Sequence, residues 1–147
     1  MMILKPYADA DYYSVSQCFP KKEIAKYTNR GGGYRILSFF AIYKSHFYLL
    51  WDDRRIVGCG VIRWKWSRDT KSFGWWLYAI WIHPNSRGKG YGVLLIESLF
   101  KELRMRNIKE VYLTVDNSNT IAKNLYDKLG FKGIQQKNQY TIMQYEL

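Results

Sequence analysis

The amino-acid sequence predicts an α+β fold in a single domain spanning residues 1–147. The first observation behind this prediction is an aromatic and apolar run at 75–82, whose length and composition are typical of a buried strand. The second is a glycine-rich segment at 87–92, which precedes an amphipathic stretch at 93–108 and so indicates a turn followed by a helix. The third is the chain length, which suits one domain and allows most apolar surface to be buried.

The N-terminal half is expected to contain short strands and helices. The glycines at 31–33 are expected to break the chain as a hinge or loop. Two strand-like runs flank the polar segment 52–55, which is typical of a hairpin. The expected elements are a strand at Met2–Lys5, helices from Asp9 or Asp11 to Cys18 and at 21–27, a stretch with helical spacing at 34–44, and strands at 47–51 and 56–63.

The C-terminal half is expected to alternate strands with helices. A charged turn at 67–72 precedes the first strand, and apolar residues alternate at Val111, Leu113 and Val115. No internal repeat or low-complexity tail interrupts this order. The expected elements are a strand at 75–83, a helix at about 90–107, a strand at 110–116, a helix at 120–129 and closing strands near 131–136 and 139–146.

The segment at 87–92 reads Arg-Gly-Lys-Gly-Tyr-Gly and is a candidate anion site. Glycines let the backbone approach a ligand closely, and N–H groups at a helix N-terminus bind anions. A diphosphate is the expected ligand, and a turn that only caps a helix is the alternative. The glycine spacing differs from the dinucleotide fingerprint, and Gly88-Lys89 lacks the Ser or Thr that follows in a P-loop.

The pattern that fits is Arg-x-x-Gly-x-Gly at Arg87, Gly90 and Gly92, with Pro84 three residues earlier. It resembles the pyrophosphate-binding motif of the GNAT superfamily of acyl-CoA-dependent N-acetyltransferases. Residues 117–131 are similar to the second cofactor segment of that family. The matching residues are Asn119, Ala122, Leu125, Tyr126, Leu129, Gly130 and Phe131. The first half of the chain resembles the family only in its order of elements.

The second segment also has an interpretation from its residues alone. Asn117 or Asn119 is suited to the N-cap of a helix, and Gly130 to a left-handed residue after its end. Tyr126 is expected at the edge of the buried apolar stripe, and a packing role is the alternative to a functional one. The residues of that stripe recur at helical spacing and are Ile121, Ala122, Leu125 and Leu129.

The resemblance implies a mixed, mainly antiparallel sheet flanked by helices, in which strands 75–83 and 110–116 form a splayed central pair. In such a fold the pantetheine arm of acetyl-CoA lies in the gap like an added strand, which requires exposed backbone groups. The resemblance implies acetyl-CoA as co-substrate and no metal. The residues that it places at acetyl-CoA are Ile80, Ile82, Arg87, Gly88, Lys89, Gly90, Tyr91, Gly92, Asn119 and Tyr126.

The resemblance also implies the chemistry of acetyl transfer. An acceptor amine attacks the thioester, the backbone N–H of Ile80 stabilises the oxyanion, and Tyr126 gives a proton to the leaving thiolate. Several family members carry a Glu on the strand before the glycine turn, but 75–82 holds no carboxylate. The remaining candidates for a general base are Tyr78, His83, His46, Asp116 and a water relay. For His83, which precedes Pro84, a role at the strand end is the alternative.

The net charge of +11 favours a polyanionic ligand. Coenzyme A, with three phosphates, is one such ligand and nucleic acid is another. The chain holds 6 Trp, 13 Tyr and 7 Phe, which suit base stacking, although most lie in strand-like runs where core packing is expected. No helix-turn-helix, zinc-finger or RRM signature occurs.

Cysteine usage and hydropathy point to a cytoplasmic protein that does not bind a membrane. The protein is expected to be a monomer or a homodimer. Cys18 and Cys59 are isolated, so neither zinc nor a disulfide framework is indicated, and Cys59 is expected to be a core thiol. No apolar run approaches the roughly 20 residues of a membrane span. The N-terminus has no signal-peptide pattern.

Three functions remain open from the sequence. The first is an N-acetyltransferase with a small-molecule or peptide amine as acceptor. The second is an acetyl-CoA-binding module without turnover, which the missing carboxylate favours and Tyr126 disfavours. The third is an acyl-CoA-dependent enzyme that modifies nucleic acid, or a nucleic-acid-binding relative. Residues 20–46, expected to shape the acceptor pocket, carry no recognisable motif.

Overall fold

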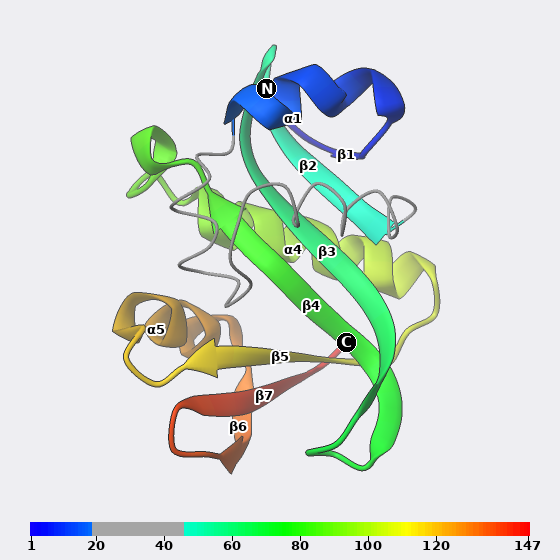
Figure 1. Ribbon diagram of the computed structural model, residues 1–147, viewed down its shortest axis with the longest axis vertical. Coiled ribbons are helices and arrows are strands. Elements are labelled where there is room, and N and C mark those ends of the chain that lie inside the picture. The colour runs from blue at the N-terminus through cyan, green and yellow to red at the C-terminus, as the bar shows by residue number, and fades with distance from the viewer. Residues whose placement is uncertain (19–45) are drawn as a thin grey trace. The chain divides into compact units, whose positions relative to one another are not determined.

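The structure is a computed structural model that describes residues 1–18 and 46–147 (Figure 1). These residues belong to two compact units. Unit 1 is the described part of Met1–Val61 together with Ala79–Leu95, and unit 2 is Ile62–Tyr78 together with Ile96–Leu147. Strands β3 and β4 and helix α4 each continue from one unit into the other. The single domain expected from the sequence stays a prediction.

The described residues contain a seven-stranded sheet with the strand order β1-β2-β3-β4-β5-β7-β6. Its strands are β1 (Met2–Pro6), β2 (Phe47–Asp52), β3 (Arg55–Ser67), β4 (Ser72–Ile82), β5 (Glu110–Asp116), β6 (Lys132–Gln136) and β7 (Tyr140–Glu146). The helical elements are η1 (Asp9–Asp11), α1 (Tyr12–Cys18), η3 (Pro84–Ser86), α4 (Tyr91–Met105) and α5 (Thr120–Leu129).

The pairing confirms the expected mixed, mainly antiparallel sheet. In unit 1, β1 pairs antiparallel with β2, and β2 with the first part of β3. In unit 2, β7 pairs antiparallel with both β5 and β6. β4 and β5 are parallel and share the register pair Trp76–Tyr112. If two strands splay apart, they are expected to pair over a short length only, and the single register pair between β4 and β5 agrees with this.

Most differences from the sequence-based expectations lie at the ends of elements. β3 extends to Ser67 and β4 begins at Ser72, so the charged turn is shorter than expected. α4 ends at Met105 because the chain reverses at Asn107, whose φ is 58°. The segments 21–27, 31–33 and 34–44 lie outside the described residues.

Each unit buries apolar side chains of its own. In unit 1, the first four residues of β2 are buried, and because successive side chains of a strand point to opposite faces, both faces of β2 are covered there. A Cβ on Gly58 would lie 2.7 Å from the carbonyl oxygen of Trp81, so β3 needs a glycine there. In unit 2, the buried side chains include Leu99, Leu103, Val111, Leu113, Ile142 and Met143.

Within the described part of the chain, no helix has both the length and the hydropathy to cross a membrane.

Candidate functional site

The glycine turn lies in unit 1, between η3 and the first residue of α4. Gly88 and Gly90 have φ angles of 75° and 80°, in the left-handed region that side chains other than glycine rarely adopt. A Cβ at either position would meet nothing within 4 Å. Gly90 accepts the N–H of Leu94 at 3.2 Å and so begins the helix. The turn therefore presents an open backbone at a helix N-terminus, which leaves room for an anion against the chain.

Two side chains fix the segment that leads into this turn. His83 caps η3, because its Nδ1 accepts the N–H of Asn85 at 3.2 Å. Arg87 donates from Nε to the carbonyl oxygen of Ile82 at 2.9 Å, which ties the start of the turn to the end of β4. The Arg87 side chain is exposed, and its Nε contact orients the guanidinium group at the turn.

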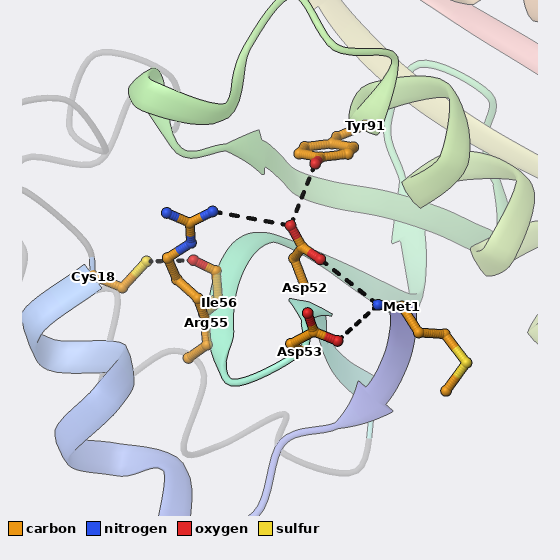
Figure 2. A network of polar contacts seen from close by, with 7 residues as sticks. All are labelled: Met1, Cys18, Asp52, Asp53, Arg55, Ile56 and Tyr91. Carbon is orange, nitrogen blue, oxygen red and sulfur yellow. Dashed lines mark hydrogen bonds and ion pairs between the residues drawn. The ribbon is translucent and has the colours of Figure 1, made fainter.

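Tyr91, the first residue of α4, belongs to a polar network at the end of β2 (Figure 2). Its hydroxyl donates to the Asp52 carboxylate at 3.4 Å, and that carboxylate lies 3.9 Å from the Arg55 guanidinium. The N-terminal ammonium donates to Asp53 at 2.7 Å, which raises the pKa of the ammonium group and lowers the pKa of the carboxyl. Asp52 was not among the predicted site residues, because nothing in the sequence relates the hairpin turn to the helix.

β4 is irregular one residue before Ile80. Ala79 has a φ of 49°, an unusual conformation for an alanine, which costs of order 1–3 kcal/mol. The thiol of Cys59 donates to the Ala79 carbonyl oxygen at 3.4 Å and supports the irregular backbone from β3. Such distortions re-aim the backbone groups that follow them. The sequence offered no signal for this feature, because alanine is not typical of positive φ.

Cys59 is fully buried, and burial raises the pKa of its thiol well above the usual value. This confirms the expected core thiol.

The second motif forms α5 in unit 2. Asn119 is its N-cap, and the side-chain oxygen accepts the N–H of Ala122 at 3.2 Å. Gly130 ends the helix in the left-handed conformation, with a φ of 102°. The alternative of Asn117 as the cap is wrong, because that side chain donates to the carbonyl oxygen of Lys137 and accepts the hydroxyl of Thr141.

Tyr126 is the buried residue of α5, with 8% of its surface exposed. The expected stripe is found in part: Ala122, Leu125 and Leu129 are partly buried, but Ile121 is 84% exposed, and Tyr126, expected at the edge, is the most buried residue of the helix. The reason is that the helix packs through Tyr126, whose ring meets Phe131 edge to face at 5.6 Å. Burial raises the pKa of Tyr126 to about 12. No hydrogen bond joins its hydroxyl to another described residue.

Three of the candidates for a general base have other interactions. His83 uses Nδ1 as a cap acceptor. Asp116 accepts the N–H and the hydroxyl of Ser118, and these bonds lower the pKa of its carboxyl. Tyr78 is half-buried, with the Lys65 ammonium 4.9 Å from its ring centroid. His46 directly follows the undescribed residues, and its position relative to a substrate stays untested.

The predicted site residues therefore fall into two groups. Unit 1 brings together Ile80, Ile82 and the whole glycine turn, whereas unit 2 holds Asn119 and Tyr126. No group of three or more His, Cys, Asp or Glu side chains that could hold a metal ion is found in residues 1–18 and 46–147.

Comparison with known proteins identifies the class of protein to which this fold and these motifs belong. Residues 12–131 match the acetyltransferase (GNAT) family. The chain therefore belongs to the GNAT family, as its two motifs predicted.

Individual relatives match smaller parts of the chain. It is 36% identical over 67 residues to a [ribosomal protein bS18]-alanine N-acetyltransferase of Haemophilus ducreyi, which is 46% of each chain. It is 40% identical over 55 residues to a mycothiol acetyltransferase of Thermobispora bispora, which is 37% of this chain and 19% of the relative. The matches thus span less than half the length of these two relatives.

Its fold is similar to that of the yncA protein of Salmonella typhimurium, solved with its cofactor acetyl-CoA. The TM-score is 0.77 at 18% identity, and the match covers 99% of this chain and 94% of the other.

Proposed function

We propose that this protein transfers the acetyl group of acetyl-CoA to a primary amine. The observation that carries the proposal is the glycine turn: at Gly88 and Gly90 the backbone is left-handed and open at the N-terminus of a helix. A diphosphate needs such a backbone, and a Cβ at either position would occupy the space beside it. Membership of the GNAT family supports acetyl-CoA as the source of that diphosphate.

The residues of the turn have distinct roles in this proposal. Backbone N–H groups from Gly88 to Gly92 bind the pyrophosphate, with the helix dipole of α4 in support. Arg87, held by the Ile82 carbonyl, adds a fixed positive charge. Tyr91 is held by Asp52 and keeps the first turn of the helix in place. The net charge of +11 attracts the polyanionic co-substrate.

Acetyl-CoA supplies an activated thioester, and the chain supplies the groups that stabilise charge around it. Ile80 is proposed to donate its backbone N–H to the oxyanion that forms when the amine attacks. The positive φ of Ala79 supports this role, because it changes the direction of the peptide group that precedes Ile80. A donor fixed in this way needs no rearrangement during the reaction.

Tyr126 is proposed to act on the leaving thiolate. Its pKa of about 12 keeps the hydroxyl protonated at any physiological pH, so it is always able to donate. A thiol of ordinary pKa, about 8.5, is the stronger acid by roughly three units. Complete proton transfer from Tyr126 is therefore uphill, and a hydrogen bond that strengthens as the thiolate forms is the favoured form of assistance.

The amine is proposed to reach the thioester already neutral. β4 carries no carboxylate, and the side chains of His83 and Asp116 are engaged in turns. With no dedicated base, the amine loses its proton to water before it attacks. This requirement favours an acceptor of low pKa, such as a peptide α-amino group near 8, over a lysine side chain near 10.

The relatives agree with a peptide α-amine but do not single it out. One is named as a [ribosomal protein bS18]-alanine N-acetyltransferase and the other as a mycothiol acetyltransferase. We therefore propose an α-amino group as the first acceptor to test and a small-molecule amine as the second.

The test is a panel of amines with release of free thiol from acetyl-CoA as the readout. The panel contains a peptide with a free N-terminus, its N-terminally blocked form with one lysine, a polyamine and an aminoglycoside. We expect turnover with the free N-terminus and little with the blocked peptide. Thermal stabilisation by acetyl-CoA without turnover of any amine would instead indicate a binding module. Absence of both effects would refute the proposed function.

A further inference from the structure

The part of the β3–β4 hairpin in unit 2 exposes three large aromatic side chains. Trp64, Trp66 and Phe73 have 52%, 55% and 60% of their surface exposed. The turn that joins the two strands is drawn in green at the lower right of Figure 1. Clustered exposed apolar side chains commonly mark a binding surface. None of these residues takes part in the proposed acetyl transfer.

The rings form one continuous aromatic surface. Trp64 stacks on Phe73 with a centroid distance of 5.9 Å and an interplanar angle of 10°. Trp66 meets Phe73 edge to face at 5.4 Å, and the half-buried Trp75 lies 5.4 Å from Trp64. Cross-strand ring pairs stabilise a hairpin, but such pairing does not require that three rings stay more than half exposed.

Beside these rings is an open hollow of about 520 Å³ with two chemically different walls. One wall belongs to the hairpin and contains Trp64, Phe73 and Trp75. The other is the segment 106–110 after α4, with the exposed side chains of Arg106 and Lys109. We call this feature, aromatic on one side and cationic on the other, the aromatic–basic groove.

One acidic side chain, Glu110, lines the groove, and a second, Asp69, lies in the turn of the hairpin; each keeps its negative charge. Glu110 accepts the Tyr112 hydroxyl at 3.0 Å and the Gln144 amide at 2.6 Å. Asp69, in the turn of the hairpin, accepts the Tyr140 hydroxyl at 3.0 Å. Lys109 makes no ion pair with another described residue.

The same holds for Arg68 and Lys71 at the hairpin turn. The groove lining itself carries the cations of Arg106 and Lys109 against the one carboxylate of Glu110, so positive charge is in excess there.

We infer that the aromatic–basic groove binds single-stranded nucleic acid. Bases stack on exposed aromatic rings whatever their identity, and lysine or arginine beside the rings neutralises the phosphates. The stacked rings supply flat surfaces for unpaired bases, and the wall at 106–110 supplies charge for the backbone. This function is separate from acetyl transfer and does not depend on it.

Two other occupants fit the groove less well. An acidic peptide satisfies the cations, but a carboxylate brings negative charge to the electron-rich faces of the rings and has no aromatic surface to stack on them. A second copy of the chain brings its own charge of +11 toward a positive surface. Stable protein interfaces also use roughly 20–30 residues per partner, far more than line this hollow.

The test measures binding of fluorescein-labelled oligonucleotides to the full chain by fluorescence anisotropy. The probes are oligo-uridine and oligo-thymidine of about 12 nucleotides, to compare RNA with DNA, and a duplex of equal length. We expect both single strands to bind, with an affinity that falls as salt rises, and the duplex to bind more weakly because its bases are already stacked. Saturating acetyl-CoA should leave this binding unchanged.

Variants then locate the site. Trp64→Ala should weaken single-strand binding at least about fivefold, and Trp64→Phe should restore most of it, because stacking needs a ring. Trp66→Ala, at the more exposed position, serves as a second variant if Trp64→Ala folds poorly. Lys109→Gln should lower the slope of log affinity against log salt by about 0.7. Lys132→Gln, a change at another exposed lysine, on β6, is the matched control and should leave both values near wild type.

Several results would overturn the inference. One is the absence of single-strand binding at low salt. Another is an affinity in both Trp64→Ala and Trp66→Ala that equals that of wild type. A third is displacement of the oligonucleotide by acetyl-CoA, which would place it at the glycine turn. Equal binding of the duplex, or displacement by a polyglutamate peptide at equal charge concentration, would show a surface that attracts anions without stacking. Self-association that Trp66→Ala abolishes, without oligonucleotide binding, would assign the groove to a second copy.

Discussion

The glycine turn of unit 1 and helix α5 of unit 2 carry the two family motifs by opposite means. The turn is exposed and is proposed to act through its backbone, and nothing lies within 4 Å of the missing Cβ atoms of Gly88 and Gly90. α5 is proposed to act through a side chain, Tyr126, which is 8% exposed and packed against Phe131. In this proposal the glycine turn provides open space for a ligand, and α5 provides the positioned hydroxyl group of Tyr126.

This difference determines which mutations are informative in each region. In the turn, adding atoms should block the ligand while the rest of the fold stays intact. In α5, removing a single atom from Tyr126 should change the chemistry with little effect on binding. Mutations in the turn should therefore lower the affinity for acetyl-CoA, whereas the mutation in α5 should lower kcat and leave that affinity nearly unchanged.

The largest effect is expected at Gly90. Replacing Gly90 with Asn adds a side chain that tolerates the left-handed conformation, and it should abolish thermal stabilisation by acetyl-CoA because the side chain fills the space for the pyrophosphate. Gly90→Val should also abolish it and should in addition lower the melting temperature, since a β-branched residue is strained at a φ of 80°.

The control for this comparison is Gly133→Ala on β6, where the added Cβ would lie 3.4 Å from the Thr141 methyl group. It should not affect stabilisation by acetyl-CoA. Full stabilisation of Gly90→Asn by acetyl-CoA would remove the basis for a diphosphate site at the turn.

The second effect is expected in α5. Tyr126→Phe removes one oxygen, so kcat should fall about 100-fold if the hydroxyl assists the thiolate, while the affinity for acetyl-CoA stays nearly unchanged. Tyr145→Phe is a matched control, because Tyr145 packs on Phe131 at 5.3 Å in the same aromatic cluster. Stopped-flow or steady-state thiol release measures both. Unchanged kcat in Tyr126→Phe would show that the thiolate leaves without this residue.

The sequence predicted the two motifs well because each depends on local chemistry. The helix cap, expected at Asn117 or Asn119, is Asn119, and the left-handed helix end is at Gly130 as expected, because both are properties of a few neighbouring residues. The left-handed φ angles of Gly88 and Gly90 are equally local. The hairpin at 52–55 also followed from local patterns, whereas the mainly antiparallel pairing was what the family resemblance implied.

What the sequence could not predict depends on contacts between distant segments. Ile121 fits the apolar spacing of α5, yet it is 84% exposed because the partners of the helix lie elsewhere in the chain. The bond between Tyr91 and Asp52 joins residues 39 positions apart. The positive φ of Ala79 leaves no trace in the residue type.

A third prediction concerns how acetyl transfer depends on pH. If no protein group takes the proton of the amine, the rising limb of kcat/KM should follow the pKa of the acceptor, about 8 for a peptide α-amine and about 10 for a lysine. The two profiles should then differ by about two pH units. A shared limb near the histidine range, roughly 6.5, that disappears in His83→Gln would instead identify His83 as a base.

A fourth prediction concerns stability at high pH. Burial raises the folded-state pKa of Tyr126 to about 12, whereas the unfolded chain has the ordinary value near 10. Below pH 10 the residue is protonated in both states and adds no pH dependence. As pH rises above 10 the unfolded chain ionises first, so stability falls, by about 1.4 kcal/mol at pH 11. Urea unfolding should show this loss in wild type relative to Tyr126→Phe, and parallel losses in both would contradict the assignment.

The smallest effect is expected at Asn119, where a local structural role and a binding role are separable. Its side-chain oxygen caps α5 through the Ala122 N–H at 3.2 Å, which leaves the amide nitrogen for a ligand. Asn119→Ala should therefore destabilise the protein by about 1 kcal/mol, the usual cost of a lost cap. Asn119→Asp keeps a capping oxygen but loses the nitrogen donor and adds a negative charge. It should preserve the melting temperature and still weaken acetyl-CoA if the residue contacts the co-substrate. Calorimetric affinities for both variants decide the matter: unchanged affinity in Asn119→Asp would reduce Asn119 to a helix cap, and α5 would then contribute to acetyl transfer through Tyr126 alone.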